Sequence, residues 1–321
     1  MPDTQEEKPS VLVVGAGAIG AFYGSVLARA GARVAAVCRA DYAAVREHGF
    51  RIRSIKFGEY VFRPERVLRS AAEYGGAPDY VLLATKVLPG EDRAALVRPA
   101  VGPRTVIVLV QNGIDIESEV AAAFPENEVL SAVAYAGVNR LEGGRLVHQS
   151  YGRIVLGRYP AGVTPAAERL GALFAAGGIS CRVVEDVQRE RWQKAVWNAV
   201  FNPLSIMGGV LDTGQILTEG APEAFVRRAL AEVCAVAAAH GHALPPSLVD
   251  QIVQNTRAMP PYKTSMALDY ANGRPMEIEA ILGNVVRAAQ RANVPIPALE
   301  AIYAIAKMVE RSAASGRASG A

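Results

Sequence analysis

The sequence predicts an α/β fold in which a doubly wound sheet domain is followed by an all-helical C-terminal domain. The first observation is a set of strand-like apolar runs, separated by helical sequence, at residues 11–14, 33–38, 80–84 and 105–110. Such runs suit strands covered on both faces, and their alternation with helices predicts the doubly wound sheet. The second observation is that the sequence beyond Asp186 is almost wholly helical.

Local signals order the remaining elements. The first strand leads into a helix that Gly31 ends. We expect short strands at 131–135, 145–149 and 153–157, with a hairpin turn at 142–144, and then a helix over 166–176 and a strand over 181–184. Further helices are expected near 187–201, 222–240, 246–257, 264–272, 276–292 and 296–311.

The expected domains are residues 1–185 for the sheet domain and 186–312 for the helical domain, with 313–321 as a disordered tail. The 321-residue chain has a formal charge of +3, which gives no footprint for nucleic acid. Its start is polar and acidic, and no apolar run reaches the ~18 residues that a membrane span needs. We therefore expect a cytoplasmic protein that binds neither nucleic acid nor a membrane.

Cysteine and histidine spacing indicates no metal site and no disulfide framework. The cysteines Cys38, Cys181 and Cys234 lie far apart and form no C-x-x-C pair. His240 and His242 follow an alanine-rich run and are typical of a helix end.

A glycine-rich loop follows the first strand directly and opens a helix. It consists of Gly15, Ala16, Gly17, Ala18, Ile19 and Gly20, which match the pattern G-x-G-x-x-G within a β-α-β unit. Gly15 permits the tight turn, Gly17 lets the backbone approach a pyrophosphate, and Gly20 allows close helix–strand packing. The helix N-terminus attracts the anion. The loop predicts a Rossmann-type dinucleotide site; the alternative is a glycine-rich turn without a ligand.

The end of the second strand indicates which nicotinamide cofactor binds. An NAD site usually has Asp or Glu there to hold the ribose 2′-hydroxyl, whereas this strand ends in Cys38 and Arg39. A guanidinium can pair with a 2′-phosphate, so Arg39 favours NADP(H). Asp41 lies two residues further on and argues the other way, and Arg39 as a solvated loop charge is the alternative.

Polar residues also follow two other predicted strands. Lys86 follows the strand at 80–84, and Asn112 follows the strand at 105–110. Ligands of open α/β sheets bind outside the carboxyl ends of the strands. Lys86 is therefore a candidate for the cofactor's phosphates or ribose, and Asn112 for the nicotinamide or a substrate; the alternative for each is an ordinary loop residue.

A polar stripe interrupts an apolar helix in the second domain. Lys194, Asn198 and Asn202 fall at i, i+4 and i+8, so they share one helix face. Buried amides and ammonium groups need partners, and a polar ligand would provide them. Hydride transfer to a ketone leaves an alkoxide that needs a proton, and a buried lysine with a lowered pKa can donate it. The alternative is that Lys194 reaches the surface and the asparagines cap or bridge helices.

A second polar constellation lies between 263 and 279. Ser265 and Asp269 share a helix face, and Glu277 falls in the first turn of the next helix. Ser265 is a candidate for a substrate carboxylate and Glu277 for a substrate hydroxyl. Taken alone, these residues are more typical of helix starts than of a substrate site.

Together these residues resemble the ketopantoate reductase family (2-dehydropantoate 2-reductases) over essentially the whole chain. The GAGAIG loop with Arg39, then Thr85-Lys86 and Gln111-Asn112-Gly113, match the first domain in order. WQKAVWNAVFNPL at 192–204 is similar to the family motif W-x-K-x-x-x-N-x-x-x-N-P-L, and TSMALD followed by GRPMEIE is similar to S-M-x-x-D … E-I-[DE].

The resemblance implies a role for each matched residue and a site between a Rossmann domain and a helical domain. Lys194 would be the general acid, Glu277 would hold the hydroxyl end of the substrate, and Ser265 would hold its carboxylate. Asn112, Asn198 and Asn202 would complete the substrate pocket, and Arg39 and Lys86 would contact NADPH. Two departures lie near that pocket: Tyr262 and Leu282 stand where the family often has asparagine.

The predicted function is the NADPH-dependent reduction of ketopantoate to pantoate, a step toward pantothenate and coenzyme A. Tyr262 and Leu282 keep open a related reductase or dehydrogenase that acts on another 2-keto or 2-hydroxy acid. A protein that senses NADPH without turnover is the alternative of another class. The sequence allows a homodimer and does not determine the oligomeric state.

Overall fold

The computed structural model describes residues 8–318 and divides into two compact units. The first unit extends to Lys86 and also includes Glu91–Asn112 and Ile116–Val187, and the second consists of Val87–Gly90, Gly113–Asp115 and the chain from Gln188 onward. The two short segments precede the boundary expected from the sequence, yet they cluster with the helical unit.

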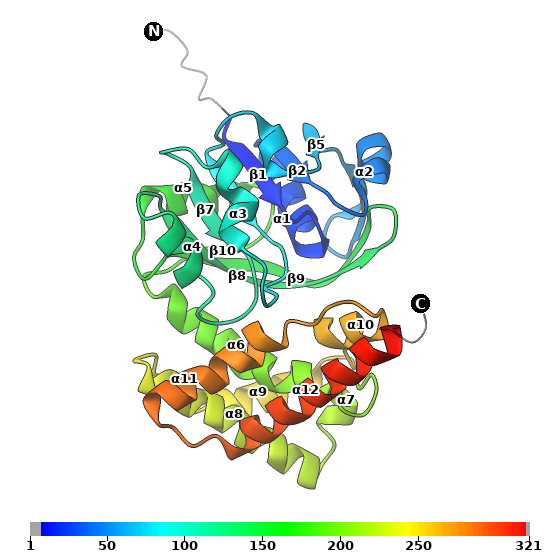
Figure 1. Ribbon diagram of the computed structural model, residues 1–321, viewed down its shortest axis with the longest axis vertical. Helices are drawn as coiled ribbons and strands as arrows, with labels where there is room; N and C mark the ends of the chain where they lie inside the picture. The colour runs from blue at the N-terminus through cyan, green and yellow to red at the C-terminus, as the bar shows by residue number, and fades with distance from the viewer. Residues whose placement is uncertain (1–7, 319–321) are drawn as a thin grey trace. The chain divides into compact units, whose positions relative to one another are not determined.

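The first unit is built on a large mixed sheet (Figure 1). Within residues 8–318 the sheet has ten strands, in the order β4-β3-β9-β8-β7-β6-β1-β2-β5 with β10 beside β9. Its parallel part comprises β5 (Arg66–Leu68), β2 (Arg33–Val37), β1 (Ser10–Val14), β6 (Tyr80–Leu83), β7 (Val106–Leu109) and β8 (Val129–Leu141). Every residue of β1, β6 and β7 is buried, as their continuous apolar sequence predicts. The predicted α/β sheet domain is confirmed.

A long hairpin extends the parallel sheet. β8 pairs antiparallel with β9 (Arg145–Arg158), and the turn falls at the predicted position, where Gly143 and Gly144 have φ of 70° and 71°. These two strands replace the three short pieces expected from the sequence, because β8 and β9 continue through two register shifts. β9 also pairs with β10 (Cys181–Val183) and with β3 (Phe50–Ser54), which carries β4 (Gly58–Phe62).

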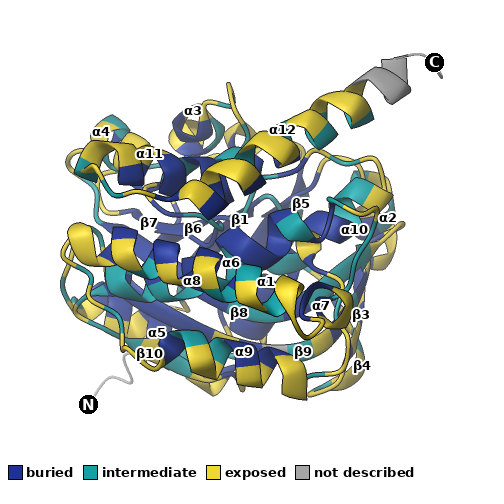
Figure 2. Ribbon diagram, turned by 90° about the horizontal axis from the view of Figure 1, so that it is seen from below, coloured by how far each residue is buried: buried dark blue, intermediate teal, exposed yellow. Residues whose placement is uncertain are grey.

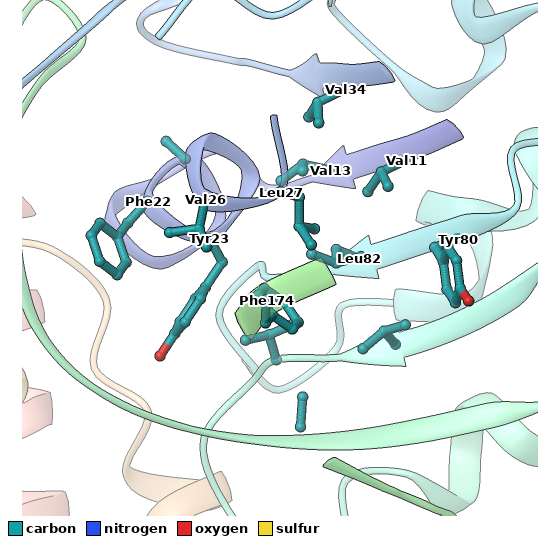
Figure 3. Packing of buried hydrophobic residues seen from close by; sticks show 14 of the residues in the cluster. Val11, Val13, Phe22, Tyr23, Val26, Leu27, Val34, Tyr80, Leu82 and Phe174 are labelled. Carbon is teal, nitrogen blue, oxygen red and sulfur yellow. The ribbon is translucent and has the colours of Figure 1, made fainter. Parts of the chain in front are cut away.

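Helices α1 (Ala18–Arg29) and α5 (Pro165–Ala176) share the core of the first unit. Phe22 and Tyr23 of α1 are fully buried, and the ring of Tyr23 lies 5.6 Å from that of Phe174 in α5. Figure 3 shows these side chains beside those of β1 and β6. The shorter elements are α2 (Tyr42–His48), η1 (Ala71–Tyr74), α3 (Arg93–Val97), η2 (Arg98–Ala100) and α4 (Ser118–Ala123).

The second unit is helical, as predicted. Its elements are α6 (Val187–Leu204), α7 (Thr213–Ile216), α8 (Ala221–Ala239), α9 (Leu248–Ala258), α10 (Ser265–Ala271), the π-helix η3 (Glu279–Gly283), α11 (Asn284–Ala292) and α12 (Pro297–Ala318). Apolar side chains of α6, α8, α11 and α12 form its core. Figure 2 shows α8 with buried residues in dark blue and exposed residues in yellow.

The C-terminal tail differs from the expectation. Residues 313–318 continue α12 instead of being disordered, and 319–321 lie outside the described residues. The stretch is rich in small residues, but Ala313, Ala314 and Arg317 favour a helix that is already formed.

Candidate active site

The glycine loop connects β1 to α1 in a turn that side chains would block. Gly15 has a φ of +91°, and a Cβ there would lie 2.6 Å from the backbone nitrogen of Thr85. A Cβ at Gly20 would collide with the carbonyl oxygen of Gly15 and lie 3.0 Å from Val13. These two glycines are therefore required by the fold of the loop itself.

Gly17 differs from the other two glycines, because a Cβ there would meet no atom within 4 Å. Gly17 is the N-cap of α1 and supplies no side chain to cap the first helical amides. An open approach to the start of a twelve-residue helix fits the pyrophosphate of a dinucleotide. The residues present therefore fit the nicotinamide cofactor that the sequence predicts.

The turn after β2 holds two opposite charges in different surroundings. The side chain of Arg39 is 70% exposed, and its Nη2 lies 3.5 Å from Oε1 of Glu91. Asp41 is buried instead, and its Oδ2 accepts a hydrogen bond from Nε of Arg140 at 2.6 Å. Asp41, the residue whose carboxylate favoured NAD in the sequence, is thus already paired with the guanidinium of Arg140.

Lys86 and Asn112 lie beyond the ends of β6 and β7, as predicted, and both are half-buried. Between these two strand ends, the buried Gln111 donates hydrogen bonds to the carbonyl and hydroxyl oxygens of Thr85, at 2.9 and 3.0 Å. Arg93 in turn donates to the amide oxygen of Gln111 at 3.2 Å. This network fixes the turn that packs against Gly15.

In the helical unit, α6 carries the predicted polar stripe. Lys194 and Asn198 are half-buried, and Asn202 is buried. The pKa of Lys194 is lowered to about 7, chiefly by burial and also by the charge of Arg191, while Glu277 acts in the opposite direction. An ammonium group with a pKa near neutrality can donate a proton and be reprotonated at physiological pH.

Glu277 and Glu279 belong to one sequence motif but have different partners. Oε1 of Glu277 accepts a hydrogen bond from the backbone N–H of Val87 at 2.9 Å, and this carboxylate acts electrostatically on Lys194. Glu279 is held at 2.8 Å by Arg287, at 2.9 Å by Lys307 and at 2.8 Å by Tyr303. Glu279 therefore links η3 to α11 and α12, whereas Glu277 shares an electrostatic environment with Lys194.

Ser265 is exposed at the first position of α10. Thr264, not Ser265, caps this helix, because its hydroxyl accepts from the N–H of Ala267 at 3.1 Å. Thr264 also contacts Ser205 at 2.7 Å, and Ser205 donates to the carbonyl oxygen of Asn202 at 2.6 Å. This chain of hydrogen bonds ties the start of α10 to the C-terminal end of the polar stripe.

The sequence analysis assigned no role to two buried residues, Arg191 and Gln111. Arg191 is 4% exposed, donates to the carbonyl oxygen of Gly113 at 3.1 Å and acts on the pKa of Lys194. Its position three residues before Lys194 on one helix was an available signal. Gln111 was seen as part of a motif, but its partner Thr85 lies 26 residues away and left no local pattern.

The described residues place limits on other kinds of site. Within residues 8–318, no three His, Cys, Asp or Glu side chains are grouped so that they could hold a metal ion. None of the helices in the described part of the chain has the length and apolar character needed to cross a membrane. The expected cytoplasmic location stays a prediction.

Comparison with known proteins identifies the chain. Residues 11–161 match the family described as ketopantoate reductase PanE/ApbA, and residues 186–310 match its C-terminal part. A 2-dehydropantoate 2-reductase from Nostoc sp. is 30% identical over 296 residues, which cover 91% of this chain and 92% of the relative. A crystal structure of 2-dehydropantoate 2-reductase from Methylococcus capsulatus is 52% identical, with a TM-score of 0.89 and coverage of 95% of this chain and 97% of that one.

The protein is therefore an oxidoreductase of the NAD(P)-dependent, two-domain type. More specifically, the chain belongs to the ketopantoate reductase family, as its motifs predict. A structure of D-mandelate dehydrogenase with NADH and anilino(oxo)acetate has a TM-score of 0.85 at 20% identity, which shows a shared fold.

Proposed function

We propose that the protein reduces 2-dehydropantoate to pantoate with NADPH and that Lys194 is the general acid. The observation that carries this proposal is the lysine on α6, whose pKa is lowered to about 7 mainly by burial. Such surroundings make the charged lysine costly to the stability of the fold. Proton donation to a developing alkoxide is a function that would account for its presence.

When bound, NADPH supplies a hydride to the ketone carbon of the substrate. Lys194 donates a proton to the oxygen that was the ketone, and the ammonium becomes a neutral amine. Glu277 stabilises the ammonium before the step, since it raises the pKa of Lys194 against the effect of burial. Glu277 would also hold a substrate hydroxyl, because a carboxylate can accept more than one hydrogen bond.

The choice of NADPH is supported by the turn after β2. Arg39 is exposed and only loosely paired with Glu91, so its guanidinium is accessible to a 2′-phosphate. Lys86 and Asn112 complete the proposed cofactor contacts together with the glycine loop at 15–20.

The choice of 2-dehydropantoate is supported by the names of relatives and by the second motif. Ser265 would bind the substrate carboxylate, and Asn112, Asn198 and Asn202 would contribute amide hydrogen bonds. Leu282 is fully buried in the apolar core of the helical unit, so this departure from the family pattern is a core substitution. It therefore gives little reason to choose another substrate.

Tyr262 keeps one alternative substrate class open. Its backbone is fixed by Thr213, whose N–H donates to the carbonyl of Tyr262 and whose hydroxyl accepts from its N–H, both at 3.0 Å. Its ring is half-buried, three residues before Ser265. An aromatic ring at that position would suit a bulkier 2-keto acid. The homodimer that the sequence allows also stays a prediction.

The test is to mix the purified protein with NADPH and 2-dehydropantoate and to follow the loss of reduced-nicotinamide absorbance. A parallel reaction contains NADH, and a panel of aliphatic and aryl 2-keto acids replaces the substrate. We expect the highest kcat/KM for 2-dehydropantoate with NADPH. A higher value for an aryl keto acid would favour the alternative, and tight NADPH binding without any turnover would indicate a sensor.

A further inference from the structure

A partly buried ion pair joins the turn after β2 to the far end of β8. Asp41 is 9% exposed, and Nε of Arg140 lies 2.6 Å from its Oδ2. The two residues are 99 positions apart in the sequence, so the long hairpin brings them together. The side chains are 10% and 31% exposed, and a charge-assisted hydrogen bond in such surroundings is stronger than one in water.

The Asp41–Arg140 pair determines which charged groups of the turn after β2 are accessible to a ligand. Burial and the nearby Asp41 raise the pKa of Cys38 to about 12, so the thiol is neutral at physiological pH. Arg140 cancels the charge of Asp41 and occupies one of its carboxylate oxygens. Arg39 is 70% exposed, and its contact with Glu91 at 3.5 Å is weakened by water and salt. The guanidinium of Arg39 is therefore what this turn offers to an incoming anion.

We propose that Arg140 determines the preference for NADPH over NADH by neutralising Asp41. The inference rests on the proposed function, because it explains how a turn that contains both Arg39 and Asp41 selects a 2′-phosphate. Without Arg140, the carboxylate of Asp41 would compete for Arg39 and repel the phosphate. It would also resemble the acidic residue that holds the ribose 2′-hydroxyl in NAD sites. Arg140 is thus a positioning residue that acts through Asp41.

The test compares Kd values for NADPH and NADH, measured by fluorescence titration of the purified protein without a keto acid. We expect Arg140→Ala to reduce the ratio Kd(NADH)/Kd(NADPH) by about tenfold or more. The double variant Arg140→Ala, Asp41→Asn removes both charges, and we expect it to restore the ratio. A merely structural role of Arg140 would change both Kd values in parallel and leave their ratio unaltered, so the ratio separates the two roles.

Arg145→Ala is the matched control, because Arg145 lies on the same hairpin, is exposed and donates to the carbonyl oxygen of Glu142. We expect it to leave the ratio unchanged. An unchanged ratio in Arg140→Ala, or failure of Asp41→Asn to restore it, would overturn the inference while leaving the proposed function intact. If the unaltered protein itself binds NADH more tightly than NADPH, the proposed cofactor is wrong and the inference fails with it.

Discussion

The loops at the carboxyl ends of β1 and β2 and the polar stripe of α6 carry different parts of the proposed reaction and are built differently. In the loops after β1 and β2, Gly15 and Gly20 shape the backbone, and the charged Arg39 is 70% exposed. On α6, burial disfavours the charged form of Lys194 and lowers its pKa to about 7. An exposed charge can bind an anion, whereas a charge that burial disfavours can exchange its proton and take part in a reaction.

The largest expected effect concerns Lys194. Lys194→Met keeps the length and apolar stem of the side chain but removes the proton donor, so we expect kcat to fall by about 10²–10⁴-fold. The Kd for NADPH, measured by fluorescence titration, should change little, because the glycine loop lies in the other unit. The matched control is Lys56→Ala, an exposed lysine on the first unit. Unchanged kcat in Lys194→Met would exclude the mechanism.

The pH profile sharpens the same prediction. Reduction needs the protonated form of Lys194, so kcat/KM should decline as the pH rises through about 7. Oxidation of the hydroxy acid needs the neutral amine and should show the opposite slope. Lys194→Met should lose this dependence in both directions, and a declining limb that persists in the variant would assign it to another group.

A smaller effect is expected in the glycine loop after β1, where Gly17 and Gly20 can each be replaced by alanine and compared. Gly17→Ala places a methyl group in open space, so the apo Tm should stay unchanged while the Kd for NADPH rises on the order of tenfold. Gly20→Ala places it against the carbonyl of Gly15 and should cost about 1–3 kcal/mol of folding stability. Calorimetry and titration of both variants separate the two roles, and equal effects on Tm would contradict them.

The smallest effect on the reaction is expected at Glu279, whose contacts link η3 to α11 and α12. Burial raises its pKa, but hydrogen bonds from Arg287, Lys307 and Tyr303 outweigh this and hold the pKa at about 2. The ionised form therefore stabilises the fold above pH ~4.5, and this contribution is lost as the pH falls toward 2. Glu279→Gln should cost about 1–2 kcal/mol at pH 7 by urea unfolding, with kcat nearly unchanged. A large loss of kcat without a loss of stability would assign Glu279 to the reaction.

The sequence predicted what local spacing determines. The glycine loop was recognised because its three glycines lie within six residues after an apolar strand. The stripe at Lys194, Asn198 and Asn202 was recognised because the helical period places these residues on one face. The sheet domain and the helical domain were also predicted from local periodicity, although β3, β4 and β5 were not predicted. β3 alternates buried and exposed residues, but over only five positions.

What the sequence did not reveal depends on partners that are distant along the chain. Asp41 argued for NAD until the structure paired it with Arg140. Leu282 suggested an altered pocket until it was found in the core. One partner of Glu277 is the backbone amide of Val87, and a backbone amide has no side-chain signature in a sequence. In each case a residue's role followed from tertiary contacts that no periodicity records.

The π-helix η3 directly follows the segment that holds Glu277. A π-turn contains one residue more than the α-helical turn that it replaces, so each residue before it lies one position, about 100°, away from the place that α-helical counting from α11 would give it. The direction in which Glu277 points is thus set by a count of residues as well as by their identities. Helical periodicity counted back from α11 therefore could not have identified Glu277 as the carboxylate that acts on Lys194.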